Sequence, residues 1–242
     1  MTIVFFLLAL LSEIIGTIGG FGSSVFFVPL SSFFFSTKGV LGITAVFHVF
    51  SNLSKIWLFR DHINRELLLR FGLPSVVGVV VGAVGATWFS SNLNGLVLGI
   101  FLLLFSAIFL IRPELVIPPT RMNAIAGGGA AGFFAGLIGT GGALRGAVMT
   151  SYNLEKNMFV ATSAMVDLGV DVTRSVIYVG NNFVGKDELW LIPGLIVVSW
   201  LGSLVGKKIL AHMSQDVFRK MVLVLIGIIG LISIVNYLYF VK

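Results

Sequence analysis

Long apolar stretches separated by short polar loops dominate this 242-residue chain and constrain its fold more than any other feature. A helix needs about 20 apolar residues to cross a bilayer core of about 30 Å, and several stretches approach that length. Charged residues make up only 11% of the sequence, against about 25% in a typical soluble domain. The loops are too short to fold separately. We therefore expect one all-α, polytopic membrane domain over residues 1–242.

The charge distribution excludes several kinds of soluble function. The chain has 16 Lys and Arg against 10 Asp and Glu, a net charge of +6. Most basic residues lie in short loops between apolar stretches, which indicates membrane topology and no nucleic-acid partner. Cysteine is absent and the three histidines are scattered. Disulfides and thiolate chemistry are therefore excluded, and no metal or organic cofactor is implied.

A glycine-rich motif occurs twice and indicates an internal repeat. Residues 16–22 read Gly-Thr-Ile-Gly-Gly-Phe-Gly and residues 136–142 read Gly-Leu-Ile-Gly-Thr-Gly-Gly, at an offset of 120. Polar residues continue the correspondence at an offset of 119: Thr44 with Ser163, His48 with Asp167, Asn52 with Asp171, and Lys55 with Arg174. The segment 112–121 combines prolines and charges that cannot lie in lipid as a helix. We predict repeat one at 1–112, a linker at 113–121 and repeat two at 122–242.

Each predicted repeat begins with two short apolar pieces that meet at the glycines and continues with three longer segments. The short pieces are 2–15 and 23–35 in repeat one, and 122–137 and 143–153 in repeat two. The longer segments are 39–59, 66–89 and 94–111, followed in repeat two by 157–179, 189–206 and 217–241. A helix of 14 residues is only about 21 Å long. We therefore expect each opening pair to form a broken or re-entrant helical hairpin, followed by three transmembrane helices.

Loop charges predict that the two repeats are inverted relative to one another. The loop 60–70 carries three arginines, whereas its counterpart 180–188 carries one lysine against two acids. The loop 90–95 is uncharged, whereas its counterpart 207–220 carries four basic residues. Placing the basic loops in the cytoplasm, together with 112–121 and 154–157, leaves ten basic residues inside and three outside. This bias obeys the positive-inside rule and predicts that both termini lie outside.

The glycine-rich breaks are the predicted substrate site, because short interrupted segments at matching positions of two repeats are typical of transporters. A helix that begins at mid-membrane presents unpaired N–H groups with partial positive charge, which hold an anion. Glycine lets the ligand approach closely. The candidate residues are Gly19, Gly22, Ser23 and Ser24 in repeat one, and Gly139, Gly141, Gly142 and Arg145 in repeat two. The alternative is that these glycines only allow helices to pack, as in GxxxG patterns.

Six charged residues fall inside apolar segments: Glu13, Lys55, Arg145, Asp167, Asp171 and Arg174. Such residues cost about 2.5–3.5 kcal/mol each in lipid and usually face a cavity or a partner. His48, Asn52 and Lys55 share one helix face at i, i+4 and i+7, and Asp167, Asp171 and Arg174 repeat that face in repeat two. We expect the two stripes to meet near a pseudo-twofold axis.

Two interpretations of these charges remain open. In the first, Asn52, Lys55, Arg145 and Arg174 hold the anion, while Asp167, Asp171, His48 or Glu13 carries a coupling proton. In the second, Asp171 and Arg174 only neutralise each other at i and i+3, Glu13 only pairs with the hairpin, and His48 is a packed histidine.

The first motif resembles the opening of the TauE/SafE family of sulfite and organosulfonate exporters. The resemblance rests on the glycines of 16–22, on Pro29-Leu30 about seven residues later, on a polar helix near Thr44, and on the second copy of the motif. Repeat two departs from it with Met149-Thr150 in place of Pro29-Leu30 and with Arg145 opposite Val25. The resemblance implies export of sulfite, sulfoacetate or a similar anion across the plasma membrane of a prokaryote.

Three rival functions are consistent with parts of the sequence. A passive anion channel would share the architecture of a carrier. An intramembrane serine protease would use Ser23 or Ser24 with His48, although these serines correspond to Ala143 and Leu144 in repeat two. A scaffold subunit would have no flux, but buried charges on matching faces argue against it. The expected partners are therefore a small anion, protons as a possible coupling ion, and the lipid bilayer.

Overall fold

The computed structural model describes residues 2–31, 33–35, 37–85, 91–138, 142–180, 185 and 189–240. Within these ranges the chain forms helices joined by turns and contains no strand. The all-α fold class is therefore confirmed.

The helices follow the predicted order. The first half of the chain forms α1 (Thr2–Gly19), α2 (Ser24–Ser31), α3 (Thr37–Phe59), α5 (Leu73–Gly85) and α6 (Ser91–Ile111). Three short segments connect α3 to α5: the 3-10 helix η1 (Arg60–His62), the short helix α4 (Arg65–Leu67) and the π-helix η2 (Leu68–Gly72). The second half forms α7 (Arg121–Ile138), α8 (Gly142–Ser151), α9 (Lys156–Gly180), α11 (Ile192–Ala211) and α12 (Gln215–Phe240).

The opening helix of each half is longer than the sequence predicted. Both α1 and α7 have 18 residues, which corresponds to about 27 Å. The helix α1 continues through Gly16, because the missing side chain leaves room for Ser23, whose Cα would lie 2.6 Å from a Cβ at that position. The chain turns only at Gly20 and Gly22, which have φ values of 70° and 93°. Only the second piece of each pair is short, with 8 residues in α2 and 10 in α8.

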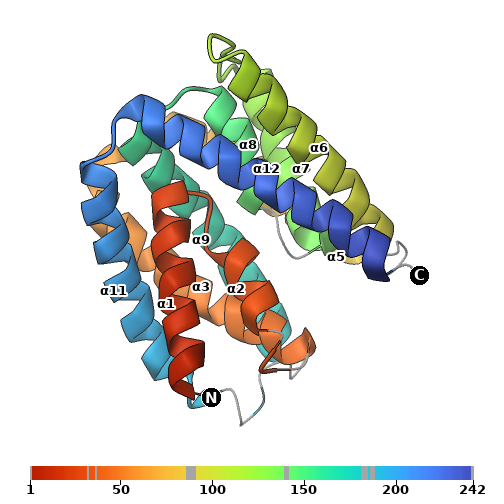
Figure 1. The fold of residues 1–242 in the computed structure, drawn as a ribbon, viewed down its shortest axis with the longest axis vertical. Coiled ribbons are helices and arrows are strands. Elements are labelled where there is room, and N and C mark those ends of the chain that lie inside the picture. Colours follow the sequence, from red (N-terminus) through yellow and green to blue (C-terminus); the bar gives the residue numbers. More distant parts are fainter. Residues whose placement is uncertain are drawn as a thin grey trace. The chain divides into compact units, whose positions relative to one another are not determined.

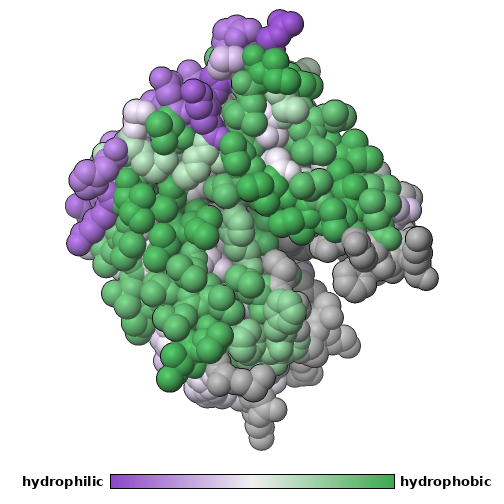
Figure 2. All heavy atoms as spheres, in the orientation of Figure 1, coloured by the Kyte–Doolittle hydropathy of each residue, from purple (hydrophilic) through white to green (hydrophobic). Residues whose placement is uncertain are grey.

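Three of the described helices are long and apolar enough to cross a bilayer. These segments are Thr2–Gly19 in α1, Ile192–Ala211 in α11 and Gln215–Val235 in α12. The surface of α1 has the same character, because Ile3, Leu7, Leu11 and Ile15 form an exposed apolar stripe at intervals of four residues. In Figure 2 the visible face of α1 and α11 is hydrophobic, and hydrophilic side chains gather at the C-terminal end of α11. The chain therefore has the character of a membrane protein, with many apolar side chains on its surface.

Packing divides the chain into two compact units. The first unit comprises Met1–Ile63 and Val160–Met213, and so contains α1, α2, α3, most of α9, and α11. The second unit comprises Asn64–Phe159 and Ser214–Lys242, and so contains α5, α6, α7, α8 and α12. Each unit combines helices from both predicted repeats.

The predicted repeats exchange one helix with each other. In the first unit, α11 packs along α1 and α3, whereas in the second unit α5 packs along α7 (Figure 1). The helices α5 and α11 occupy the same place in their repeats, so each packs against the opening helix of the other repeat. In the second unit α6 also packs along α12, its counterpart in the other repeat.

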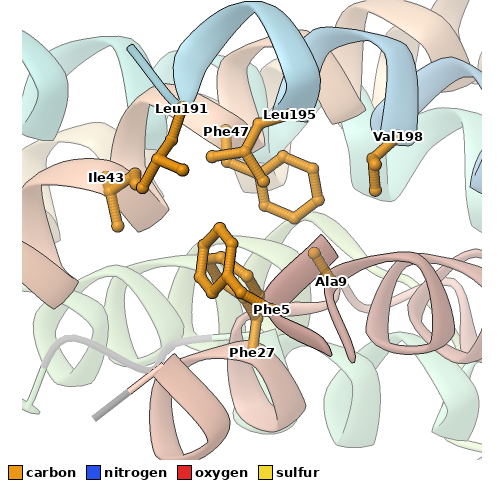
Figure 3. Close-up of a cluster of buried hydrophobic side chains, with 8 residues drawn as sticks. All are labelled: Phe5, Ala9, Phe27, Ile43, Phe47, Leu191, Leu195 and Val198. Carbon is orange, nitrogen blue, oxygen red and sulfur yellow. The ribbon is translucent and has the colours of Figure 1, made fainter. Parts of the chain in front are cut away.

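A cluster of buried apolar side chains forms part of the core of the first unit. Figure 3 shows side chains from α1, α2, α3 and the start of α11 pointing toward one another. The ring of Phe27 lies 5.7 Å from that of Phe5 and 4.8 Å from that of Phe47, measured between centroids. The other members are Ala9, Ile43, Leu191, Leu195 and Val198. This cluster fixes α2 against its neighbours and so positions the break between α1 and α2.

Candidate functional site

The break between α1 and α2 turns a serine hydroxyl into the interior of the first unit. The carbonyl oxygen of Ser23 accepts hydrogen bonds from the backbone N–H groups of Phe26 and Phe27, at 3.0 and 2.8 Å, so Ser23 precedes the first turn of α2. Its side chain does not cap that helix but donates to Glu13 Oε2 on α1, at 2.8 Å. Ser23 is completely buried.

Glu13 is the hub of a buried polar network. Its side chain is completely buried, yet its carboxylate accepts hydrogen bonds from four hydroxyl groups. Besides Ser23, Ser51 on α3 donates to Oε1 at 2.8 Å, Ser203 on α11 at 3.0 Å and Thr17 on α1 at 3.2 Å. The carboxylate therefore connects α1, α3, α11 and the start of α2.

Lys55 on α3 completes this first cluster as an ion pair. Its Nζ lies 2.8 Å from Glu13 Oε1 and donates to Ser51 Oγ at 2.7 Å. The pair needs space between α1 and α11, and Gly202 provides it, because a Cβ there would lie 2.6 Å from Glu13 Cγ. A buried charge is tolerated when it is paired and hydrogen-bonded, and both conditions hold here.

A second ion pair lies on α9. The guanidinium of Arg174 contacts Asp171 Oδ1, and Asn52 Nδ2 on α3 donates to Asp171 Oδ2 at 2.9 Å. Asn52 and Asp171 are counterparts in the predicted repeats, so the two polar stripes meet as the sequence predicted. All three side chains are buried.

His48 on α3 connects the two ion pairs. Its Nε2 lies 3.1 Å from Ser23 Oγ, and its Nδ1 lies 3.7 Å from Asp171 Oδ2. The imidazole is buried, with 4% of its surface exposed. A continuous series therefore runs from Glu13 through Ser23 and His48 to Asp171.

The order of Ser23, His48 and Asp171 is also that of a hydrolase triad, in which a carboxylate orients the histidine and the histidine activates the serine. Two features of the geometry differ. The hydroxyl of Ser23 donates to Glu13 at 2.8 Å, so its proton is directed to a second carboxylate. The distance of 3.7 Å between His48 Nδ1 and Asp171 Oδ2 exceeds the length of a normal hydrogen bond. The Ser23 hydroxyl is therefore not directed to His48, as activation of a nucleophilic serine requires.

The structure places the remaining candidate residues as follows. Gly19 ends α1, Gly22 lies in the turn, and Ser24 is the buried first residue of α2. Asp167 is buried on α9, one turn before Asp171. Gly142 begins α8 in the second unit, and Arg145 is buried within that helix, with 3% of its surface exposed. Gly139 and Gly141 lie outside the described residues.

Both interpretations of the intramembrane charges have a counterpart in this geometry. Lys55 and Arg174 each hold a carboxylate of the protein, which corresponds to mutual neutralisation. His48 lies between the two pairs, which corresponds to a proton-handling group. Glu13, assigned only a pairing role in the second interpretation, contacts more polar side chains than that role requires.

Sequence reasoning missed the hydroxyl groups that surround Glu13. Thr17 follows Glu13 by four residues and Ser51 precedes Lys55 by four, so helical spacing could have placed both on the polar faces. Ser203 carries no such signal, because its role depends on how α11 packs against α1. The hydroxyl of Ser54 donates to Ser203 Oγ at 2.7 Å and extends the network. This contact also depends on the packing of α11, so helical spacing does not predict it.

A comparison with family models matches residues 5–232 of the chain to the family described as sulfite exporter TauE/SafE. No match was found among curated proteins or among solved structures. The matched range covers nearly all of the sequence, including the buried network of the first unit and all of α7, α8, α9 and α11. The chain therefore belongs to the TauE/SafE sulfite exporter family of membrane transporters.

Proposed function

We propose that this protein exports a small sulfur-containing anion, sulfite or an organosulfonate such as sulfoacetate, by alternating access across the plasma membrane of a prokaryote. The observation that carries the proposal is the buried network around Glu13 and Asp171. Intramembrane charges are expensive and usually mark a transport pathway. Apolar side chains would hold the helices together at a lower cost, so the retained charges indicate a role in transport.

The inverted-repeat architecture is part of this proposal. Residues that lie on a twofold axis contact their own counterparts, and the hydrogen bond between Asn52 and Asp171 joins two such counterparts. The exchange of α5 and α11 between the repeats also supports it. With the basic loops in the cytoplasm, both termini lie outside.

In this mechanism the anion competes with two carboxylates of the protein for the cationic side chains of Lys55 and Arg174. Lys55 is held by Glu13 and Arg174 by Asp171. Sulfite and sulfonate groups offer oxygen acceptors of the same kind, which cationic donors bind strongly. An arriving anion that replaces Glu13 at Lys55 loosens the contact between α1 and α3. This exchange of partners links substrate binding to helix movement.

Each glycine-rich segment supplies further anion donors within its own unit. In the first unit, Gly19 and Gly22 bring the backbone close to Ser23 and Ser24 at the start of α2, where a helix terminus favours an anion. The equivalent break in repeat two contains Gly139, Gly141 and Gly142, followed by Arg145. Arg145 contributes a buried guanidinium, whereas repeat one has Val25 at the corresponding position.

The membrane potential favours export without a further energy source. An anion that leaves a cell with a negative interior gains about 2.3 kcal/mol per charge for each 100 mV. A coupled proton then adjusts the rate or the direction of transport rather than supplying all of the driving force.

Uptake of radiolabelled sulfite into proteoliposomes at a fixed membrane potential tests the proposal. We expect saturable uptake that unlabelled sulfite on the opposite side accelerates, because counterflow requires a carrier and a channel does not show it. We expect Arg145→Ala to lower uptake by at least ~10-fold, since removing a buried charge contact costs 2–5 kcal/mol. Lys208→Ala is the matched control, because Lys208 is exposed at the end of α11 and should leave uptake unchanged.

The same assay with sulfoacetate, thiosulfate and sulfate defines the substrate class. Absence of saturable flux for all four anions in folded protein would contradict the proposal. Flux without counterflow would identify a channel. Equal losses in Arg145→Ala and Lys208→Ala would remove Arg145 from the site.

A further inference from the structure

The hydroxyl of Ser23 stands between an imidazole and a carboxylate and can donate to only one of them. It lies 2.8 Å from Glu13 Oε2 and 3.1 Å from His48 Nε2. When Ser23 donates to Glu13, His48 must carry a proton on Nε2 and donate it to Ser23 Oγ. When His48 Nε2 is bare, it draws the hydroxyl proton away from Glu13. The protonation of His48 and the bonding of Glu13 are therefore linked through one hydroxyl group.

The formal charges of the buried side chains in the first unit sum to zero only when His48 is counted as protonated. The buried charged side chains that the structure describes in this unit are three carboxylates and two cations: Glu13, Asp167 and Asp171, with Lys55 and Arg174. Their formal charge is −1 when His48 is neutral and zero when it is protonated. An uncompensated buried charge is costly. The face of His48 opposite Ser23 also meets a carboxylate, with Nδ1 3.7 Å from Asp171 Oδ2.

We propose that His48 binds the coupling proton of this transporter and passes it through Ser23 to Glu13, and that this transfer releases Lys55 for the anion. The inference rests on the proposed transport function. The N–H bond at His48 Nε2 breaks as a new O–H bond forms on Ser23. The original O–H bond of Ser23 breaks as one forms on Glu13 Oε2. His48 becomes neutral, Glu13 becomes a neutral acid, and Ser23 is unchanged.

The groups around His48 come from every helix packed against it. From α1 comes Glu13, which shares the hydroxyl of Ser23 with His48, and from α9 comes Asp171, which pairs with Arg174. Asp167 on α9 acts electrostatically on Arg174. Its own helix α3 contributes Lys55, one of the two cations of the network. From α11 the network includes only neutral groups, the hydroxyl of Ser203 and the backbone carbonyl oxygen of Ser199, and α2 begins at Ser24 without a charged side chain.

Protonation of Glu13 changes the first ion pair directly. A neutral acid no longer compensates the ammonium of Lys55, which lies 2.8 Å away. The most effective replacement for the lost negative charge is an anion. A proton on Glu13 and an anion at Lys55 therefore favour each other, and this coupling acts equally in both directions at equilibrium. The relay passes through Ser23, at the start of α2, so it also involves the break between α1 and α2.

Nitrogen NMR of ¹⁵N-histidine-labelled protein in lipid nanodiscs tests the relay without measuring transport. The sequence has only three histidines, and the exposed His62 and His212 provide reference signals. The signals that disappear in His48→Gln belong to His48. We expect His48 to be protonated on both nitrogens in acid and to retain Nδ1–H, facing Asp171, in alkali. In a neutral imidazole either nitrogen can carry the proton, and the hydrogen bond that the other nitrogen makes decides which one does.

Variants at Ser23 separate the relay from packing. We expect Ser23→Ala to change the alkaline tautomer of His48, and Ser23→Thr, which keeps the hydroxyl, to preserve it. His48 signals that do not respond to pH, or that are the same in Ser23→Ala and the wild type, would overturn the proposal.

Sulfite flux at a fixed potential supplies the second measurement. We expect an imposed difference of one pH unit to change wild-type flux by up to ~10-fold, the ratio of protonated sites on the two sides. His212→Gln and Ser23→Thr should respond similarly, whereas His48→Gln and Ser23→Ala should not respond. Wild-type flux that ignores pH would overturn the relay but leave anion export standing. Absence of flux with the expected NMR behaviour would instead contradict the export function.

Discussion

The interface of α1 with α11 and that of α7 with α5 are built from corresponding helices of the two predicted repeats, yet their interiors differ. The first encloses an ion pair and several hydroxyl groups. The second brings two helix backbones into contact. The same exchange of helices therefore serves two purposes in one chain.

In the first unit, glycines on α11 make room for side chains of α1. A Cβ at Gly202 would lie 2.6 Å from Glu13 Cγ, and one at Gly206 would lie 2.7 Å from Thr17 Cβ. The space that these glycines leave is filled by a carboxylate and a hydroxyl that belong to the network.

In the second unit, glycines on α7 make room for the backbone of α5 and of η2, the segment that leads into α5. A Cβ at Gly132 would lie 2.0 Å from the carbonyl oxygen of Ser75, and one at Gly128 would lie 2.2 Å from that of Phe71. This spacing is the GxxxG pattern of closely packed membrane helices. The hydroxyl of Ser75 donates to the carbonyl oxygens of Phe71 and Gly128, at 2.9 and 3.0 Å, and so stays within the interface.

Residue identities at corresponding positions explain the difference. At an offset of 120, Glu13 corresponds to Phe133, and Ser23 corresponds to Ala143. At the same offset Ser203 corresponds to Ala83. Glu13, Ser23 and Ser203 of the network therefore correspond to apolar residues of the second unit. We infer that the α1–α11 interface handles charge during transport, while the α5–α7 interface holds its two helices together.

The largest expected effect comes from breaking the ion pair of the first unit. Glu13→Gln leaves Lys55 buried without a counter-charge, so we expect the free energy of unfolding to fall by about 3–5 kcal/mol. Adding Lys55→Met removes the isolated charge and should restore most of the loss. Unfolding in mixed detergent micelles measures both. Equal stability of wild type and Glu13→Gln would show that the network does not support the fold.

A smaller effect is expected from overpacking the second unit. Gly132→Ala forces a methyl group against backbone atoms, so we expect a loss of about 1–3 kcal/mol in the same unfolding measurement. Gly129→Ala is the matched control on the same helix, because nothing lies within 4 Å of a Cβ there. Similar stabilities of the two variants would contradict the close approach of α5 and α7.

Removing one hydroxyl from the network tests how the Glu13 carboxylate shares its partners. Ser203→Ala deletes one donor while three hydroxyls and an ammonium remain, so we expect a loss of only about 1 kcal/mol. A loss as large as that of Glu13→Gln would mean that Ser203, and not Lys55, dominates the stabilisation of the carboxylate.

The smallest effect is expected at an exposed ion pair of the second unit. Arg70 and Glu66 lie 2.6 Å apart, with 39% and 69% of their side chains exposed. Exposed pairs contribute about 0–1 kcal/mol and are screened by salt. Glu66→Gln should therefore change unfolding by less than about 0.5 kcal/mol, and 1 M salt should remove the difference. A larger change would indicate that this pair has a further partner.

Much of the fold follows from patterns that a single sequence contains. The lengths of the apolar segments predicted the order of the helices, and helical spacing predicted that Asn52 and Asp171 share a polar contact region. The break between α1 and α2 lies within the predicted glycines, but α1 continues to Gly19, because Gly16 serves close packing whereas Gly20 and Gly22 provide the turn. A glycine's role depends on what lies next to it, which sequence spacing does not encode.

The site was harder to predict, because its centre depends on contacts between distant helices. The sequence indicated the pair of Asp171 and Arg174 but not the pair of Glu13 and Lys55. Glu13 and Lys55 are 42 positions apart, and Ser203 joins them only because α11 packs against α1. His48 gained its significance in the same way, from the positions of Ser23 and Asp171 on other elements.

Sulfite counterflow by the Glu13→Gln/Lys55→Met double variant tests the central claim most directly. This variant is expected to fold, since the isolated charge is removed, but it lacks the ion pair to which the account assigns anion exchange. Phe133→Leu, at the corresponding position of α7, is the control. We predict that the folded double variant loses nearly all counterflow while Phe133→Leu keeps it within about twofold, since apolar substitutions of similar size are well tolerated. Counterflow at the wild-type rate in the double variant would contradict a functional role for the charged interior of the first unit.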